Sequence, residues 1–242
     1  RPLPRRRRKW LTAAIVVVIA AVGGTYAYRT RSNPMQDART LLDRYDKIEN
    51  VDKAISILEP AVKARPADPA RHTMLAEAYW RRYEATRDKT LIERAADAAS
   101  ASLKLDANYA STHVVLAIFN NGQSRYDGAA GEAQQAIKLD PKSSGGWREL
   151  GRAYQRMGKL EDAGKAFAKA VELGPNDWLA HNYMGGFYFA TNRFDEAAKE
   201  FEQVRVIAPD NVRAYNNLGS VSLRQERFDR AIEMYERSLS LE

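Results

Sequence analysis

The sequence contains no cysteine among its 242 residues. Without thiols the chain can form no disulfide bond, no thiolate metal site and no cysteine nucleophile. Histidine is scarce as well, with only His72, His113 and His181 present. The residue orders typical of serine hydrolases, phosphate-binding P-loops and kinase catalytic domains do not occur. We therefore expect no catalytic residue, no metal site and no cofactor site within these residues.

A basic surface is missing from most of the chain. The formal net charge is +7, but residues 1–31 hold eight Lys and Arg side chains and no acid, which leaves residues 32–242 with a net charge of −1. Binding to a phosphate backbone requires a basic surface on the folded part of a protein. We therefore expect no nucleic-acid partner for this segment.

Charged side chains are also absent from residues 10–28, WLTAAIVVVIAAVGGTYAY. A helix of this length spans roughly 28 Å, close to the ~30 Å hydrocarbon core of a bilayer. Trp10 at one end and Tyr26 and Tyr28 at the other match interfacial aromatic belts, and the cationic block 5–9 precedes the segment. We predict a basic cytoplasmic stub at 1–9, a transmembrane helix at 10–28 that anchors the chain in the lipid bilayer, and a linker at 29–34. The remainder would then lie outside the cytoplasm, in the periplasm.

Two other interpretations of this segment are weaker. A cleaved signal peptide would show the same basic and apolar regions, with Thr25-Tyr26-Ala27 as a small-x-small site. A buried helix of a soluble domain would show a polar face, which residues 15–22 lack. Because the sequence begins with Arg1, we expect further residues upstream, and a cleaved signal inside a longer chain would be unusual.

Beyond Pro34 the sequence repeats with a period of 34 residues. The clearest unit is 144–177, with its characteristic residues at unit positions 4, 7, 8, 11, 15, 20, 24, 27 and 32: Trp147, Leu150, Gly151, Tyr154, Gly158, Ala163, Phe167, Ala170 and Pro175. Positions 4, 7, 8 and 11 form one stripe of a helix, and positions 20, 24 and 27 form another. Small residues at 8, 20 and 27 would let two helices approach closely, and larger residues at 4, 11 and 24 would fill the space between them. The histidines all occupy position 4, in separate units, so we expect them to pack rather than to bind metal.

This pattern resembles the tetratricopeptide repeat. The resemblance implies an all-α solenoid of six helix-turn-helix repeats, over 35–68, 69–109, 110–143, 144–177, 178–211 and 212–242. We name the two helices of a unit A and B. The second unit has 41 residues, and its seven extra residues are expected between its helices, near Tyr83 to Leu91. Tyr45 is assigned to position 11 of the first unit.

In this family the solenoid binds protein or peptide partners in a concave groove, and it carries no enzymatic activity of its own. The order of basic stub, membrane helix, linker and array also resembles the middle of a bacterial transmembrane Ser/Thr protein kinase, in which the repeats are the outer sensor and signal to the cytoplasm. Two alternatives remain. One is a membrane-bound transcriptional regulator with a winged-helix domain upstream, and the other is a non-enzymatic assembly or secretion factor of the envelope.

Positions 5, 9 and 12 of the A helices would line the groove of such a solenoid. The predicted groove residues there and beside them are Arg148, Arg152, Gln155, Arg156, Asn182, Arg213, Asn216 and Asn217. Guanidinium groups match carboxylates bidentately, so we expect an acidic partner. Replacing Arg148 and Arg152 by Ala is expected to weaken that partner's binding and to leave stability unchanged. The alternative is that these arginines are solvated or pair with acids such as Glu149.

Overall fold

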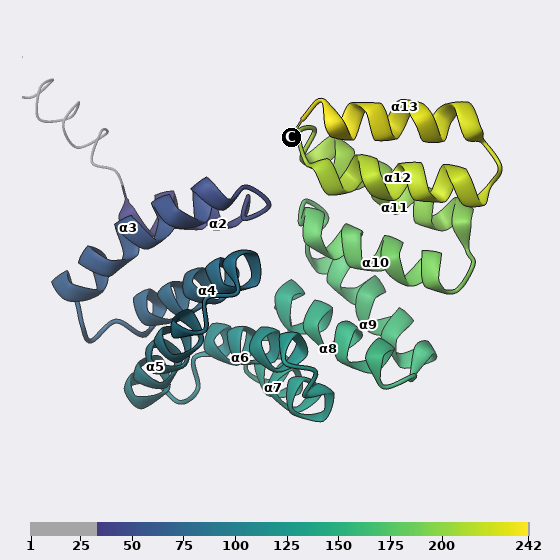
Figure 1. Ribbon diagram of the computed structural model, residues 1–242. Helices are drawn as coiled ribbons and strands as arrows, with labels where there is room; N and C mark the ends of the chain where they lie inside the picture. Colours follow the sequence, from purple (N-terminus) through teal and green to yellow (C-terminus); the bar gives the residue numbers. More distant parts are fainter. Residues whose placement is uncertain (1–32, 242) are drawn as a thin grey trace, which may run out of the picture.

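The computed structural model describes residues 33–241, and every regular element within that range is an α-helix. The twelve helices pair in chain order into six antiparallel hairpins, which follow one another around a curve (Figure 1). Their bounds are α2 Pro34–Leu42, α3 Ile48–Ala64, α4 Pro69–Thr86, α5 Thr90–Leu105, α6 Ala110–Gly122, α7 Tyr126–Leu139, α8 Ser144–Arg156, α9 Leu160–Leu173, α10 Trp178–Ala190, α11 Phe194–Ile207, α12 Val212–Arg224 and α13 Phe228–Leu239. The predicted all-α solenoid of about six repeats is confirmed. The even-numbered helices are the A helices and the odd-numbered helices are the B helices.

Side chains fix where five of the six A helices begin. The side-chain oxygen of the residue before each helix accepts a hydrogen bond from a backbone N–H in the first turn, which satisfies a donor that has no partner within the helix. These N-cap residues are Asn33, Asp68, Ser143, Asp177 and Asn211. The same short polar residues separate consecutive hairpins, so the caps also set the repeat length.

The small residue at position 8 allows the A and B helices of one hairpin to touch. A Cβ atom added to Gly151 would lie 2.7 Å from the Phe167 ring, and Gly185 faces Phe201 at the same distance. Gly219 faces Tyr235 in the same way. Side-chain atoms do not approach this closely, so only glycine lets the position-24 ring fill the hairpin.

Position 4 joins each hairpin to the one before it. In five units the side chain at this position lies within hydrogen-bond distance of the backbone carbonyl six residues earlier, in the turn that ends the previous unit. The pairs are His72–Pro66, His113–Ala107, Trp147–Pro141, His181–Pro175 and Tyr215–Pro209, at 2.7 to 3.2 Å. A carbonyl can only accept, so each side chain donates. The histidines are therefore structural joints between units.

The seven extra residues of the second unit lie where the sequence placed them, but they form helix rather than a loop. Helix α4 has 18 residues where α6, α8, α10 and α12 have 13, and α5 has 16 where α7, α9 and α11 have 14. Extending two paired helices keeps every added backbone group hydrogen-bonded, which an inserted loop would not.

The first unit departs from the pattern. Helix α2 has only 9 residues and ends at Leu42, and α3 does not begin until Ile48. Tyr45 therefore lies in a loop, so its assignment to the A-helix stripe is wrong. We call residues 43–47 the bridging loop, because it contacts units far along the chain.

The predicted membrane helix at 10–28 and the flanking segments 1–9 and 29–32 lie outside the described residues. Among the helices within residues 33–241, none has the length and apolar character needed to cross a bilayer.

Candidate functional site

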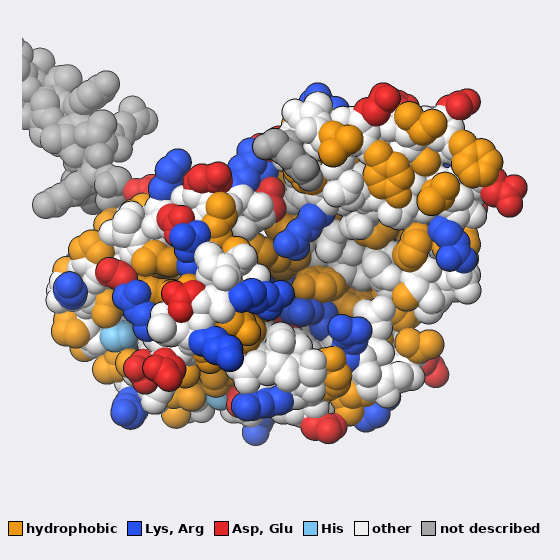
Figure 2. Space-filling view, in the orientation of Figure 1, with side chains coloured by type: hydrophobic (Ala, Val, Ile, Leu, Met, Phe, Trp, Pro, Cys, Tyr) orange, Lys and Arg blue, Asp and Glu red, His pale blue; other side chains and the backbone are white. Residues whose placement is uncertain are grey.

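The A helices line the inner face of the curve. Each of the three cavities described below is walled mainly by A helices and by the turns at their ends. Figure 2 shows arginine and lysine side chains gathered around the hollowed centre of the molecule. This inner face is the surface that the sequence identified as the groove.

The bridging loop crosses the inner face to the fifth unit. The Trp178 indole N–H donates to the backbone oxygen of Asp43 at 2.7 Å, and the rings of Tyr45 and Trp178 pack with centroids 5.6 Å apart. Arg44 pairs with Asp210 at 2.6 Å, and Lys47 pairs with the same carboxylate. These contacts join residues more than 130 positions apart, so the solenoid is closed by its first hairpin.

Arg81 of α4 packs against the Tyr45 side chain of the bridging loop. Its guanidinium lies 4.0 Å from the centroid of the Tyr45 ring and pairs with Glu84 at 3.0 Å. Arg81 is almost completely buried. Burial opposes its charge, but the Tyr45, Glu84 and Glu77 side chains outweigh that cost and raise its pKa.

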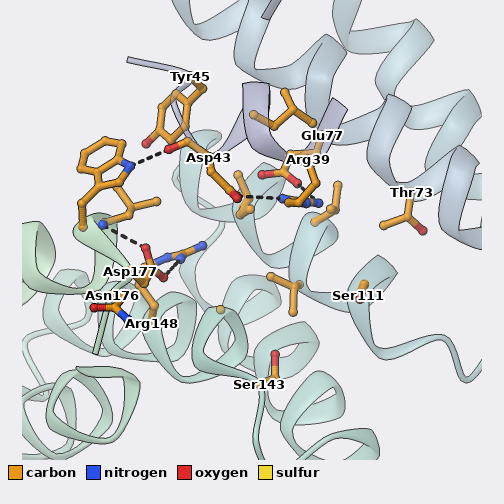
Figure 3. Close-up of a pocket in the computed structure, with 17 residues that line it drawn as sticks. Arg39, Asp43, Tyr45, Thr73, Glu77, Ser111, Ser143, Arg148, Asn176 and Asp177 are labelled. Atoms are coloured by element: carbon orange, nitrogen blue, oxygen red, sulfur yellow. Dashed lines mark hydrogen bonds and ion pairs between the residues drawn. The ribbon is translucent and has the colours of Figure 1, made fainter. Parts of the chain in front are cut away.

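On one side of the loop lies a cavity of about 540 Å³, which we call the acidic cavity. Asp43, Glu77 and Asp177 line it together with two arginines, Arg39 and Arg148 (Figure 3). Arg39 pairs with Glu77 at 3.0 Å, and Arg148 pairs with Asp177 at 2.8 Å. Both arginines are therefore already neutralised by carboxylates. Burial raises the pKa of Asp43, because it removes that carboxyl group from water.

On the other side lie two cavities of about 360 and 460 Å³, which we call the basic cavities. Five arginines line them against two acids, Asp46 and Glu84, and Tyr183 lines both. The arginines are Arg81, Arg87 and Arg213 in the first and Arg152 and Arg156 in the second. The bridging loop thus separates parts of the inner face that differ in charge.

Behind the basic cavities, Glu149 is completely buried. Its carboxylate accepts from Arg152 at 2.6 Å, from Arg148 at 3.2 Å and from the Asn121 amide at 3.0 Å. Burial alone would raise the pKa of Glu149, but the charges of Arg152 and Arg148 outweigh it and lower the pKa. Arg148 and Arg152 are therefore held in the fold. Contrary to the expectation from the sequence, we therefore predict that replacing Arg148 and Arg152 by Ala destabilises the fold.

Five of the eight predicted groove residues line one of the three cavities. Arg148 lines the acidic cavity, Arg152, Gln155 and Arg156 line the second basic cavity, and Arg213 lines the first. Asn182 and Asn217 bond to each other, with the Asn217 amide donating at 2.9 Å, and Asn216 is exposed. None of these three asparagines lines a cavity described above.

Several cavity residues were not predicted. Trp80 and Arg81 belong to the longer α4, and Arg87 is the C-cap residue that follows it. Asn121 lies at the end of α6, and Tyr45 belongs to the irregular loop. The one sequence signal was the excess length of the second unit, which carries α4 past the end of a standard A helix. Within residues 33–241 no group of three or more His, Asp or Glu side chains is arranged to hold a metal ion.

Comparison with known proteins agrees with this architecture. Residues 148–211 and 188–241 match the tetratricopeptide repeat family model. No curated protein sequence is significantly similar to the chain. Many solved structures are similar in fold.

Three of these structures show the range of similarity. A crystal structure of MamA is 23% identical, with a TM-score of 0.53 over 65% of this chain and 92% of that one. A second MamA structure is 22% identical, with a TM-score of 0.51 over 70% and 91%. A monomeric mutant of IFIT1 with Gppp-AAAA is 17% identical, with a TM-score of 0.68 over 78% of this chain and 46% of that one. At these identities the likeness concerns the fold alone. Residues 148–241 match the tetratricopeptide repeat model, and residues 33–241 form an all-α solenoid of six helical hairpins.

Proposed function

We propose that the chain is a membrane-anchored scaffold that binds a protein or peptide partner on the inner face of its solenoid. The observation that carries the proposal is the hollow inner face, where the A helices and the turns at their ends line three cavities. Tetratricopeptide repeat regions typically bind proteins or peptides and are typically non-catalytic, which agrees with the absence of an active-site motif.

The finer proposal is that the solenoid is the periplasmic sensor of a bacterial transmembrane Ser/Thr kinase. It is supported by the order of the basic stub, the apolar segment 10–28, the short linker and the array. The winged-helix regulator and the envelope assembly factor share that order. The residues encoded upstream distinguish the three, because they would contain kinase catalytic motifs, a DNA-recognition helix or neither.

A fusion of alkaline phosphatase after Glu242 tests the anchor and its orientation. Alkaline phosphatase becomes active only where its disulfides form, outside the cytoplasm. We expect an active, membrane-associated fusion, and we expect deletion of residues 10–28 to make it inactive. An inactive parent fusion, together with a fluorescent cytoplasmic reporter at the same position, would refute the topology.

Site-specific photo-crosslinking in the native host tests the scaffold. A photoreactive amino acid at Ser111 or Gln155 reports on the inner face, and one at Glu161, which is exposed on α9, is the control. We expect one discrete adduct that is shared by the two inner positions and absent from the control. If the inner positions give the same adducts as Glu161, the inner face is not the binding surface.

A further inference from the structure

The geometry of the basic cavities points to a ligand of defined chemistry. We infer that they bind a peptide segment with several side-chain carboxylates, through arginines that have no acidic partner in the fold. This inference rests on the proposed function and identifies the partner's chemistry at the same surface. It adds Arg87, which no repeat position predicts, to Arg156 and Arg213.

Arg87, Arg156 and Arg213 share one arrangement. Each guanidinium lies over a tyrosine ring, at 5.8 Å for Arg87 on Tyr83, 5.9 Å for Arg156 on Tyr126 and 5.8 Å for Arg213 on Tyr45. Within residues 33–241 none of the three makes a salt bridge, and all three are exposed. Without a carboxylate partner in the described fold, these guanidinium groups keep their N–H groups for a carboxylate of a ligand.

The arginines of the acidic cavity can be compared with those of the basic cavities. Its two arginines are both bonded to carboxylates of the fold, at 3.0 and 2.8 Å. In the basic cavities the five arginines exceed the two acids that line them, Asp46 and Glu84, by three charges. An anionic partner is therefore favoured on one side of the bridging loop and not on the other.

The positions of the arginines favour several carboxylates over one. Arg87 follows the last residue of α4, Arg156 is the last residue of α8 and Arg213 is the second residue of α12. The three arginines line two cavities that share Tyr183. One terminal carboxylate cannot occupy both cavities, whereas alternate acidic side chains of an extended segment can.

The aromatic side chains argue against a nucleic acid. Arg81 lies over the Tyr45 ring at 4.0 Å and Arg152 lies over the Tyr183 ring at 4.6 Å. Single-stranded nucleic acids bind by stacking bases on free aromatic faces, and an arginine already occupies one face of each of these two rings.

Buried polar atoms without partners give independent support. Within residues 33–241 four buried side-chain polar atoms lack a hydrogen bond, and three belong to residues that line the basic cavities. They are Trp80 Nε1, Arg81 Nε and Asn121 Oδ1. Folded proteins normally satisfy such groups. Three of the four such groups in the described residues therefore lie in the walls of the basic cavities.

Fluorescence anisotropy with the 242-residue chain in detergent tests the inference. The probe is a labelled twelve-residue peptide of alternating Glu and Ser with an amidated C-terminus. The test variant is Arg87→Gly/Arg156→Ala. Glycine suits position 87, because Arg87 has a φ of 61° there, so the variant is expected to keep its helical content and thermal midpoint. The control, Arg224→Ala/Arg227→Ala, removes the same charge outside the cavities, and Arg224 also stacks on a ring, that of Phe194.

At low salt we expect the test variant to lose at least about tenfold in affinity and the control less than about twofold. The test variant should also show a flatter salt dependence. Equal losses in both variants would mean that only long-range charge attracts the peptide, and this would overturn the inference. So would binding that requires a free C-terminal carboxylate, or tighter binding of a twelve-nucleotide single-stranded RNA. If the peptide fails to bind while the inner-face crosslinks persist, this inference is wrong and the scaffold proposal stands.

Discussion

At the scale of single residues, Glu149 shows why the inner face holds its shape. It is completely buried beside two guanidinium groups and one amide. Removing one member of such a buried cluster leaves charges without a counter-charge in a site that excludes water. The arginines predicted to await a ligand are therefore partly committed to Glu149.

We predict that Glu149→Ala lowers the free energy of unfolding by about 3 kcal/mol. Glu172→Ala removes a surface carboxylate paired with Lys169 and should cost less than about 0.5 kcal/mol. Because the pKa of Glu149 is lowered in the fold, its contribution is present above the unfolded pKa, about 4.3, and is lost as the pH falls through the folded value. Urea unfolding at pH 7 and at pH 4 measures both effects. Equal costs for the two variants would contradict the prediction.

Residue patterns predicted packing well and polar pairing poorly. Gly151, Phe167 and their equivalents repeat at fixed positions, so their contacts follow from helix periodicity alone. The partners of Arg148 are Glu149 beside it and Asp177, the last residue of the same unit and the N-cap of α10. Position 5 holds Arg148 in one unit and Asn182 in the next, so no repeat pattern encodes that pairing. The sequence therefore predicted the helices and their packing but not which arginines are paired within the fold.

At the scale of the helix and its turn, either a histidine or a tyrosine at position 4 can bond to the turn that ends the previous unit. His181 lies 2.7 Å from Glu200, at position 23, and His113 faces Glu132 in the same way. In the sixth unit Tyr215 and Met234 occupy the corresponding positions. Both types of side chain donate to the preceding turn, but only histidine carries a charge that depends on pH.

We predict that His181 makes the joint between the fourth and fifth units sensitive to pH. Burial would lower the pKa of His181, but hydrogen bonds with Glu200 and the Pro175 carbonyl outweigh it and raise the pKa. Its stabilisation is therefore complete below the unfolded pKa, about 6.5, and is lost as the pH rises through the folded value. The variant His181→Tyr/Glu200→Met, which copies the sixth unit, should lose less unfolding free energy than the parent between pH 6 and pH 8.5. Parallel pH profiles for the two proteins would show that His181 is neutral throughout.

At the scale of the whole molecule, the bridging loop decides whether the solenoid is open or closed. No repeat unit predicts this contact, because it joins the bridging loop to Trp178 and Asp210, at the two ends of the fifth unit. Local periodicity determines how neighbouring hairpins stack. It carries no information about where the curve brings distant hairpins together. The repeat pattern was misleading here, because it placed Tyr45 at position 11 of an A helix, whereas α2 already ends at Leu42.

We predict that Tyr45→Ala opens the closure without reducing helical content, because Tyr45 lies in a loop. The natural absence of cysteine allows two spin labels to be attached at introduced cysteines, with Gln36 on α2 and Val206 on α11 as exposed sites. Pulsed electron resonance should give a narrow distance distribution for the parent and a broad one for Tyr45→Ala. Phe228→Ala, which removes an exposed ring on α13, is the control. A narrow distribution in all three proteins would mean that hairpin stacking alone sets the distance.

Closure also changes how the array should unfold. In an open stack of repeats each hairpin contacts only its neighbours, so the outer hairpins fray first and amide hydrogens exchange faster toward either end. Here the α2–α3 hairpin is held by its neighbour α4 and, through the bridging loop, by the fifth unit. Its amides should therefore exchange about as slowly as those of α8 and α9, while α12 and α13 exchange fastest. Protection against exchange would then be high at the N-terminal hairpin and low only at the C-terminal hairpin, instead of falling toward both ends.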